Sequence, residues 1–135
     1  KSLNKSTFVL EVKMDYWFLM ISALISFLSV LIHGIIGTGM YMGNINKSDL
    51  EPLTKSLSLV SWNVYTIFLF IGGVTFTYIA YNPEFSIAAY PIIFINILGA
   101  ALFILLGLGK HRVLLKMPGA LLMATTALFA YLGIN

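Results

Sequence analysis

Four long apolar runs that contain no Asp, Glu, Lys or Arg constrain this chain more than any other feature. They cover about residues 16–36, 57–80, 87–108 and 117–134, the last being the shortest. About 20 apolar residues cross a hydrocarbon core as a helix. Lipid offers backbone N–H and C=O groups no partner, so such runs form helices and not isolated strands. The sequence therefore predicts an all-α polytopic membrane protein, a single domain over residues 1–135 built as an antiparallel four-transmembrane-helix bundle.

Composition supports the same fold class and excludes several others. Of the 135 residues 59% are hydrophobic and 10% are charged, which is far from the balance of a water-soluble domain. The chain has no cysteine, so disulfides, thiolate metal sites and iron–sulfur clusters are excluded. No basic groove is interleaved with stacking aromatic residues, so we expect no nucleic-acid partner.

The segments between the runs predict where helices begin and end. Residues 1–15 form a polar N-terminal segment, too polar for the apolar part of a signal peptide, and Met14 is a possible internal start. Gly37, Gly39 and Gly43 disfavour continuation of the first helix, so we expect it to end near residue 36. Asp49 is the expected cap of the second helix, outside the bilayer. The short links at 81–84 and 109–112 predict antiparallel neighbours.

Positive charge predicts the orientation. The first and third connections carry Lys47, Lys55, Lys110, Arg112 and Lys116, whereas the opposite side carries Lys1, Lys5 and Lys13, of which only the last is near a membrane end. Because cytoplasmic loops are enriched in Lys and Arg, we expect both termini outside the cytoplasm of a bacterial inner membrane. The aromatic residues expected at the outer interface agree: Tyr16, Trp17, Tyr78, Tyr81, Tyr90 and Tyr131.

Small and polar residues recur every three or four positions in each run and predict the faces that avoid lipid. They are Ser22, Ser26, Ser29, His33 and Gly37 in the first run, Asn63, Thr66, Gly73 and Thr77 in the second, Asn96, Gly99 and Gly107 in the third, and Gly119, Thr126, Ala130 and Gly133 in the fourth. Such stripes are typical of close helix packing in membranes.

His33 is the only ionisable side chain placed within a run, and ionisable groups inside a membrane are functional candidates by default. Asn63 is expected at a similar depth, next to Trp62 and Tyr65, with Asn96 deeper. These five residues predict either an interhelical polar network or a ligand pocket. Catalytic and metal-binding residues are not predicted. Lys110, Arg112 and Lys116 are expected to contact lipid headgroups.

A short pattern resembles a family of small four-helix bacterial inner-membrane proteins of unassigned activity, which reads His-x-x-x-Gly, then Leu-x-Pro-Leu, then Trp-His. Here it appears as His33 to Gly37, Leu50 to Leu53, and Trp62-Asn63, over the first half of the chain. Asn63 replaces the second histidine, so the resemblance does not imply a paired-histidine site for metal or haem. His111 is the only other histidine, and a haem that bridges His33 and His111 is kept as a minor alternative.

Three functions follow as hypotheses. The first is a non-catalytic membrane subunit or assembly partner that binds membrane lipids and either another membrane protein or copies of itself. The second is a small oligomeric transporter or channel, although all five acidic residues lie outside the runs, which argues against carboxylate-driven proton exchange. The third is a redox subunit that contacts a quinone or haem. The expected motifs of membrane enzymes are missing, so we expect no catalysis by the chain alone.

Overall fold

The computed structural model describes the backbone of residues 5–135 and the side chains from Met14 onward. The helical elements are α1 (Lys5–Leu31), the π-helix η1 (Ile32–Gly37), α2 (Thr38–Lys47), α3 (Pro52–Tyr81), the 3₁₀ helix η2 (Pro83–Ala88), α4 (Ala89–Leu108), the 3₁₀ helix η3 (Arg112–Lys116) and α5 (Gly119–Leu132). The described part of the chain contains no strand. The all-α prediction is confirmed.

Three helical stretches are long and apolar enough to cross a membrane. They are Met14–Lys47, Pro52–Tyr81 and Pro83–Leu108, whereas Gly119–Leu132 is an apolar helix of only 14 residues. A 14-residue helix is about 21 Å long, which is shorter than a hydrocarbon core of about 30 Å. The chain therefore has the helices of a membrane protein, with the predicted fourth crossing (117–134) present as a shorter helix.

The predicted end of the first helix near residue 36 is wrong. The helix continues from α1 through η1 into α2 and ends at Lys47. Gly34 and Gly37 do not break it, because their missing side chains admit residues of α3: a Cβ on Gly37 would lie 2.7 Å from Trp62 Cζ2, and one on Gly34 would lie 3.0 Å from Thr66 Cγ2. These glycines serve close helix packing, which here outweighs their low helix propensity.

The starts of the first and second helices also differ from the prediction. The first helix begins at Lys5 and not at residue 16, while the predicted polar segment before it lies largely outside the residues whose side chains are described. The second helix begins at Pro52, with Glu51 in the N-cap position and no side-chain cap, so Asp49 does not cap it. Proline suits this first position because its missing N–H has no partner there.

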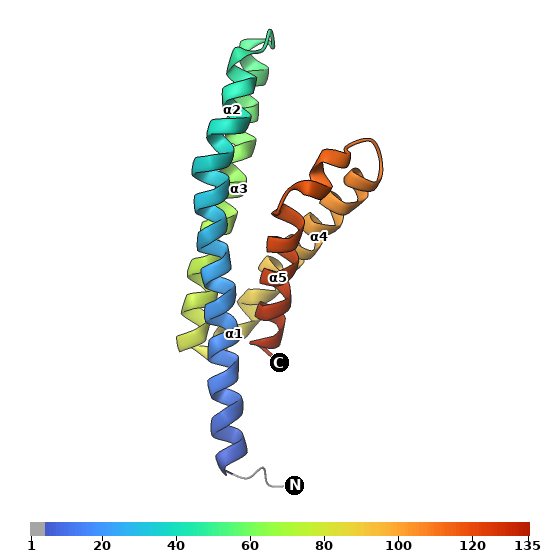
Figure 1. Cartoon of the computed structure of the whole chain (residues 1–135). Helices are drawn as coiled ribbons and strands as arrows, with labels where there is room; N and C mark the ends of the chain where they lie inside the picture. The colour runs from blue at the N-terminus through green and yellow to red at the C-terminus, as the bar shows by residue number, and fades with distance from the viewer. Residues whose placement is uncertain (1–4) are drawn as a thin grey trace.

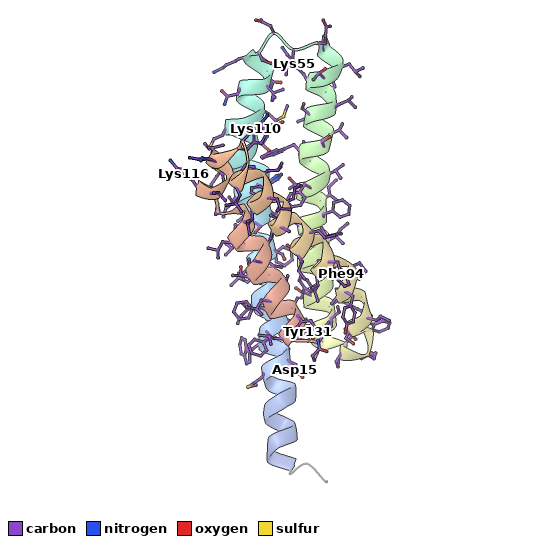
Figure 2. All side chains as sticks on the ribbon, turned by 90° about the vertical axis from the view of Figure 1, so that its right-hand side faces the viewer. Asp15, Lys55, Phe94, Lys110, Lys116 and Tyr131 are labelled. Carbon is purple, nitrogen blue, oxygen red and sulfur yellow. The ribbon has the colours of Figure 1, made fainter. Side chains whose placement is uncertain are left out.

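The helices form one long pair and one short pair (Figure 1). The rod of α1, η1 and α2 lies alongside α3, while α4 and α5 lie together and lean away from that pair. α1 packs on both α3 and α5, but α3 and α4 make little contact beyond the turn that joins them. Lys55, at the tip of the long pair, lies farther out than Lys110 and Lys116 at the tip of the short pair (Figure 2).

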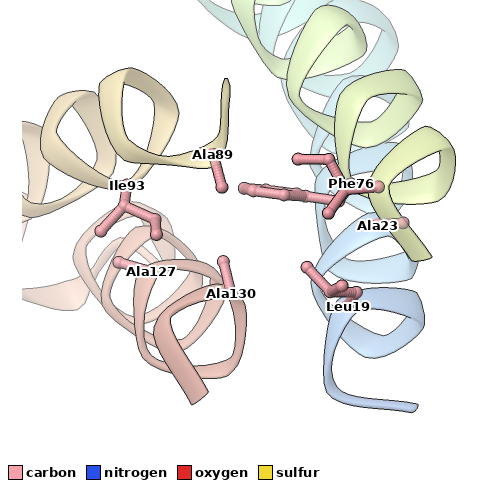
Figure 3. Packing of buried hydrophobic residues seen from close by; sticks show 8 residues of the cluster. Leu19, Ala23, Phe76, Ala89, Ile93, Ala127 and Ala130 are labelled. Atoms are coloured by element: carbon pink, nitrogen blue, oxygen red, sulfur yellow. The ribbon is translucent and has the colours of Figure 1, made fainter. Parts of the chain in front are cut away.

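Four helices meet only near the end that holds Tyr81 and the C-terminus. There Phe76 of α3 points toward Ala89 of α4 and lies among residues of α1 and α5 (Figure 3). The buried cluster consists of Leu19, Ala23, Phe76, Ile79, Ala89, Ile93, Ala127 and Ala130. The four alanines let the helices approach closely around the single large ring, as small residues do in membrane helix packing. We call this region the core end.

Beyond the core end, α2 and the first three turns of α3 extend as a two-helix projection. We call this region, residues 38–62, the arm. It has little of the apolar character of the other helices, with Thr38, Asn44, Asn46 and Lys47 on α2. Asn46 O accepts a hydrogen bond from Lys55 Nζ at 3.1 Å, which ties the two helices at the tip. The arm is thus a polar extension of an apolar helix pair.

Candidate functional site

An aromatic stack holds the base of the arm together. The indole of Trp62 lies between two rings, with the His33 ring centroid at 3.9 Å and an interplanar angle of 12°, and the Tyr41 centroid at 4.5 Å and 17°. Tyr65 meets the His33 ring edge-on at 5.1 Å. The stack therefore joins η1, α2 and α3 through four rings. Each pair of rings in contact stabilises the junction.

The π-helix supplies the backbone acceptor for this stack. In η1 the N–H of Thr38 bonds to the carbonyl of His33, five residues earlier, and Trp62 Nε1 donates to the same carbonyl at 3.2 Å. The indole N–H also lies 2.9 Å from Thr38 Oγ1. Wider π turns open backbone carbonyls to other donors and are frequent at functional sites. The local widening thus lets the indole of Trp62 reach the backbone of η1.

His33 bonds to Thr66 and not to Asn63. His33 Nδ1 lies 2.9 Å from Thr66 Oγ1. Asn63 is exposed and donates from Nδ2 to the carbonyl of Leu59 in its own helix at 2.8 Å. The structure therefore does not bring Asn63 to His33, whose partner on α3 is Thr66.

Asn96 is separate from His33 too. It is buried in α4 and donates to the carbonyl of Ile92 at 2.9 Å. Together with Tyr65 it lines a small cavity of about 30 Å³ between α3 and α4. Tyr65 is the link between the two places, since its hydroxyl donates to Met123 Sδ of α5 at 2.7 Å. Of the five predicted site residues, the structure brings His33, Trp62 and Tyr65 together.

A groove of about 460 Å³ lies against the stack, on the face of α3 that Tyr65 turns toward α5. Its volume is in the range of small-molecule sites. The groove is lined by His33, Tyr41, Thr54, Leu57, Ser58, Ser61, Trp62 and Tyr65. Sequence reasoning missed Tyr41 and Thr54 because it took residues 37–56 for a connection, and it missed Ser58 and Ser61 because it did not include them in the polar stripe of the second run. The spacing of Thr54, Ser58 and Ser61, four and then three residues apart, was the signal that could have found this face.

Two tyrosines give a reference level from which the position of the groove along the helices can be counted. Tyr16 and Tyr81 share a level because their hydroxyls lie 2.9 Å apart. At about 1.5 Å per residue, His33 lies about 26 Å from Tyr16, and Trp62 about 28 Å from Tyr81. If the tyrosines mark one interface, a hydrocarbon core of about 30 Å ends near His33 and Trp62. The hydroxyls of the groove then lie among the lipid headgroups.

The remaining predicted contacts lie at the tip of the short pair. Lys110, Arg112 and Lys116 are all exposed, in and beside η3. His111 is exposed there as well, in the loop after α4, on the other helix pair from His33. Within the described residues no group of three or more His, Cys, Asp or Glu side chains could hold a metal ion.

No family model matches the chain, and no curated protein or solved structure matches it either.

Proposed function

We propose that this chain is a non-catalytic membrane subunit that assembles with a second copy of itself through the outer face of α2. The proposal includes four membrane crossings in an antiparallel arrangement, with both termini outside the cytoplasm of a bacterial inner membrane, as the positions of lysines and tyrosines predict. Lys110, Arg112 and Lys116 then contact cytoplasmic-side headgroups.

The observation that carries the proposal is a pair of glycines with nothing beside them. A Cβ on Gly39 or on Gly43 would meet no atom within 4 Å outside its own helical neighbourhood. At the glycines that face other helices, a neighbouring side chain occupies the space beside the glycine: Phe27 beside Gly73, Met123 beside Gly99 and Leu19 beside Gly133. Among the glycines within the described helices, Gly39 and Gly43 are the two that have open space beside them.

Their spacing favours a second copy as the partner. Glycines four residues apart lie on one helix face and allow two helix backbones to approach closely, and the same motif on each partner makes the contact self-complementary. This face is on the opposite side of α2 from Tyr41, because a step of two residues turns a helix by about 200°. Self-association thus leaves the groove open.

Disulfide crosslinking tests the proposal cleanly, because the chain has no cysteine. Ile36→Cys places a thiol three residues before Gly39 on the same face, at an exposed position. In native membranes we expect oxidation to give a dimer of this chain, and Gly43→Leu on the same background to abolish it by filling the contact face.

The matched control is Leu98→Cys on α4, where 67% of the side chain is exposed compared with 59% for Ile36. It should stay monomeric under the same oxidation. The proposal is wrong if Ile36→Cys forms no dimer, if Gly43→Leu leaves the dimer intact, or if the thiol at position 36 is crosslinked to a different protein.

A further inference from the structure

The groove beside Trp62 contains hydrogen-bonding groups that the protein itself does not use. Ser22, Ser29, Ser56, Thr66 and Thr77 each donate to a carbonyl of their own helix, as hydroxyls in helices commonly do. The hydroxyls of Thr54, Ser58 and Ser61 make no hydrogen bond within the described part of the chain, and all three line the groove. One face of α3 thus offers three free hydroxyls over two turns.

His33 adds a fourth group. Its Nδ1 is bonded to Thr66, which leaves Nε2 without a hydrogen-bond partner among the described residues. No buried side-chain nitrogen or oxygen in that part of the chain lacks a partner, so Nε2 is accessible, and His33 lines the groove. In a neutral imidazole this atom is either a donor or an acceptor, so it can bond a carbonyl or a hydroxyl oxygen.

The lining selects an uncharged headgroup. None of the eight lining residues is Asp, Glu, Lys or Arg. A phosphate or carboxylate here would lack the cationic partner that its desolvation requires. Hydroxyl groups, by contrast, match neutral oxygens because they both donate and accept.

The surroundings select a ligand with an apolar chain. The groove lies at the membrane edge described above. Its hydroxyls are farther from the bilayer centre than Trp62, and Tyr65 is nearer to the centre. Tyr65 also lines the separate small cavity between α3 and α4, whose other lining residues include Phe68, Leu69 and Ile92, where those two helices make little contact. A chain that runs from the groove toward the bilayer centre passes along this apolar seam.

We propose that the groove binds a neutral amphipathic lipid, with its uncharged, oxygen-bearing head hydrogen-bonded to His33, Ser58 and Ser61 and its apolar chain along the α3–α4 seam. Thr54 lies at the outer end and Tyr41 closes the side. Two sources share this chemistry, a prenyl quinone and a diacylglycerol. The site is independent of the self-association proposed above.

Fluorescence of Trp62 reports occupancy directly. Trp17→Phe removes the only other tryptophan and leaves Trp62 as a single reporter in nanodiscs of the full chain. We titrate decylubiquinone in one arm and 1,2-dioctanoylglycerol in the other. Saturable quenching by the quinone, or a saturable emission change with dioctanoylglycerol, supports the site and identifies its source. A signal that rises linearly with both probes shows partitioning into lipid alone and overturns the proposal.

Variants then locate the site. Ser58→Ala combined with Ser61→Ala removes two free hydroxyls and should weaken binding of the active probe about fivefold or more, since two hydrogen bonds to the head are lost. Ser56→Ala is the matched control, because that hydroxyl is bonded to Pro52 O outside the groove, and it should not change the affinity. Equal effects of the control and the double variant contradict the site.

His33→Phe keeps an aromatic ring on Trp62 but removes both ring nitrogens. It should weaken binding at least fivefold while circular dichroism and the elution volume stay unchanged. Phosphatidylglycerol at the same concentration should not displace the probe. Displacement by that anionic lipid would overturn the assignment of an uncharged head. Dimer crosslinking at position 36 is measured separately, so failure of either proposal is distinguishable from failure of the other.

Discussion

The core end and the arm are held together by different forces. At the core end four helices enclose Phe76, which is 0% exposed, among alanines and aliphatic side chains. In the arm two helices share no such cluster, and only Met42 of α2 is a buried apolar residue. Instead the aromatic stack and the hydrogen bonds of Trp62 and His33 connect η1 and α2 to α3. The core end is therefore stabilised by apolar packing, whereas the arm is held by ring stacking and hydrogen bonds and carries the polar groups that have no partner.

Phe76→Ala should break the core end and give the largest loss of stability. Removing a fully buried ring leaves a cavity between all four helices, and such changes cost about 3–5 kcal/mol. Equilibrium unfolding of the detergent-solubilised protein with SDS measures the free-energy change. Phe94→Ala is the control, because the Phe94 side chain is 58% exposed, and its loss should be below about 1 kcal/mol. Similar losses for the two variants would contradict the placement of the core.

Trp62→Phe should weaken the arm by less, about 1–2 kcal/mol. Phenylalanine preserves a ring between His33 and Tyr41 but cannot donate to His33 O or Thr38 Oγ1. Amide hydrogen exchange should show faster exchange in η1 and α2 with little change at the core end. Exchange that accelerated equally at both ends would show that the two regions unfold as one unit. Trp17→Phe, whose side chain is 56% exposed, should leave the exchange of the arm unchanged.

Thr66→Val should give the smallest effect, about 0.5–1.5 kcal/mol, by removing the hydroxyl that pairs with His33 Nδ1. The ring stays stacked on Trp62, so the arm should keep its fold. ¹⁵N NMR of the imidazole measures the change directly, because the Nδ1 shift reports its hydrogen bond. Thr66→Ser retains the hydroxyl and should restore the wild-type shift. An unchanged Nδ1 shift in Thr66→Val would show that this bond does not form in the membrane.

Much of the packing could be read from spacing alone. The serines of the first helix, Ser22, Ser26 and Ser29, are all buried as the stripe predicts, and Ser22 Oγ reaches the carbonyl of Thr126 on α5 at 3.2 Å. Thr126, Ala130 and Gly133 of the last helix are buried as well. These predictions hold because every third or fourth residue shares a face, and small residues gain most from close contact.

The candidate site could be predicted only in part. His33 stood out as an ionisable residue in an apolar run, and Trp62 and Tyr65 were expected near it. Thr66 was assigned to a packing stripe, whereas Asn63, the more polar residue, was expected as the partner. Side-chain polarity does not decide which residue faces a neighbour, since Thr66 pairs with His33 whereas the exposed Asn63 bonds to its own helix.

The sequence by itself determined that this chain is helical and apolar enough to cross a membrane, because uncharged runs of this length leave the backbone no other way to satisfy its hydrogen bonds in lipid. It also determined which helix faces carry small residues. Only the tertiary structure decided that the first helix continues past Gly37, because glycine ends a helix or admits a neighbour depending on what packs against it. Trp62 packs there, and that contact creates both the arm and the groove beside it.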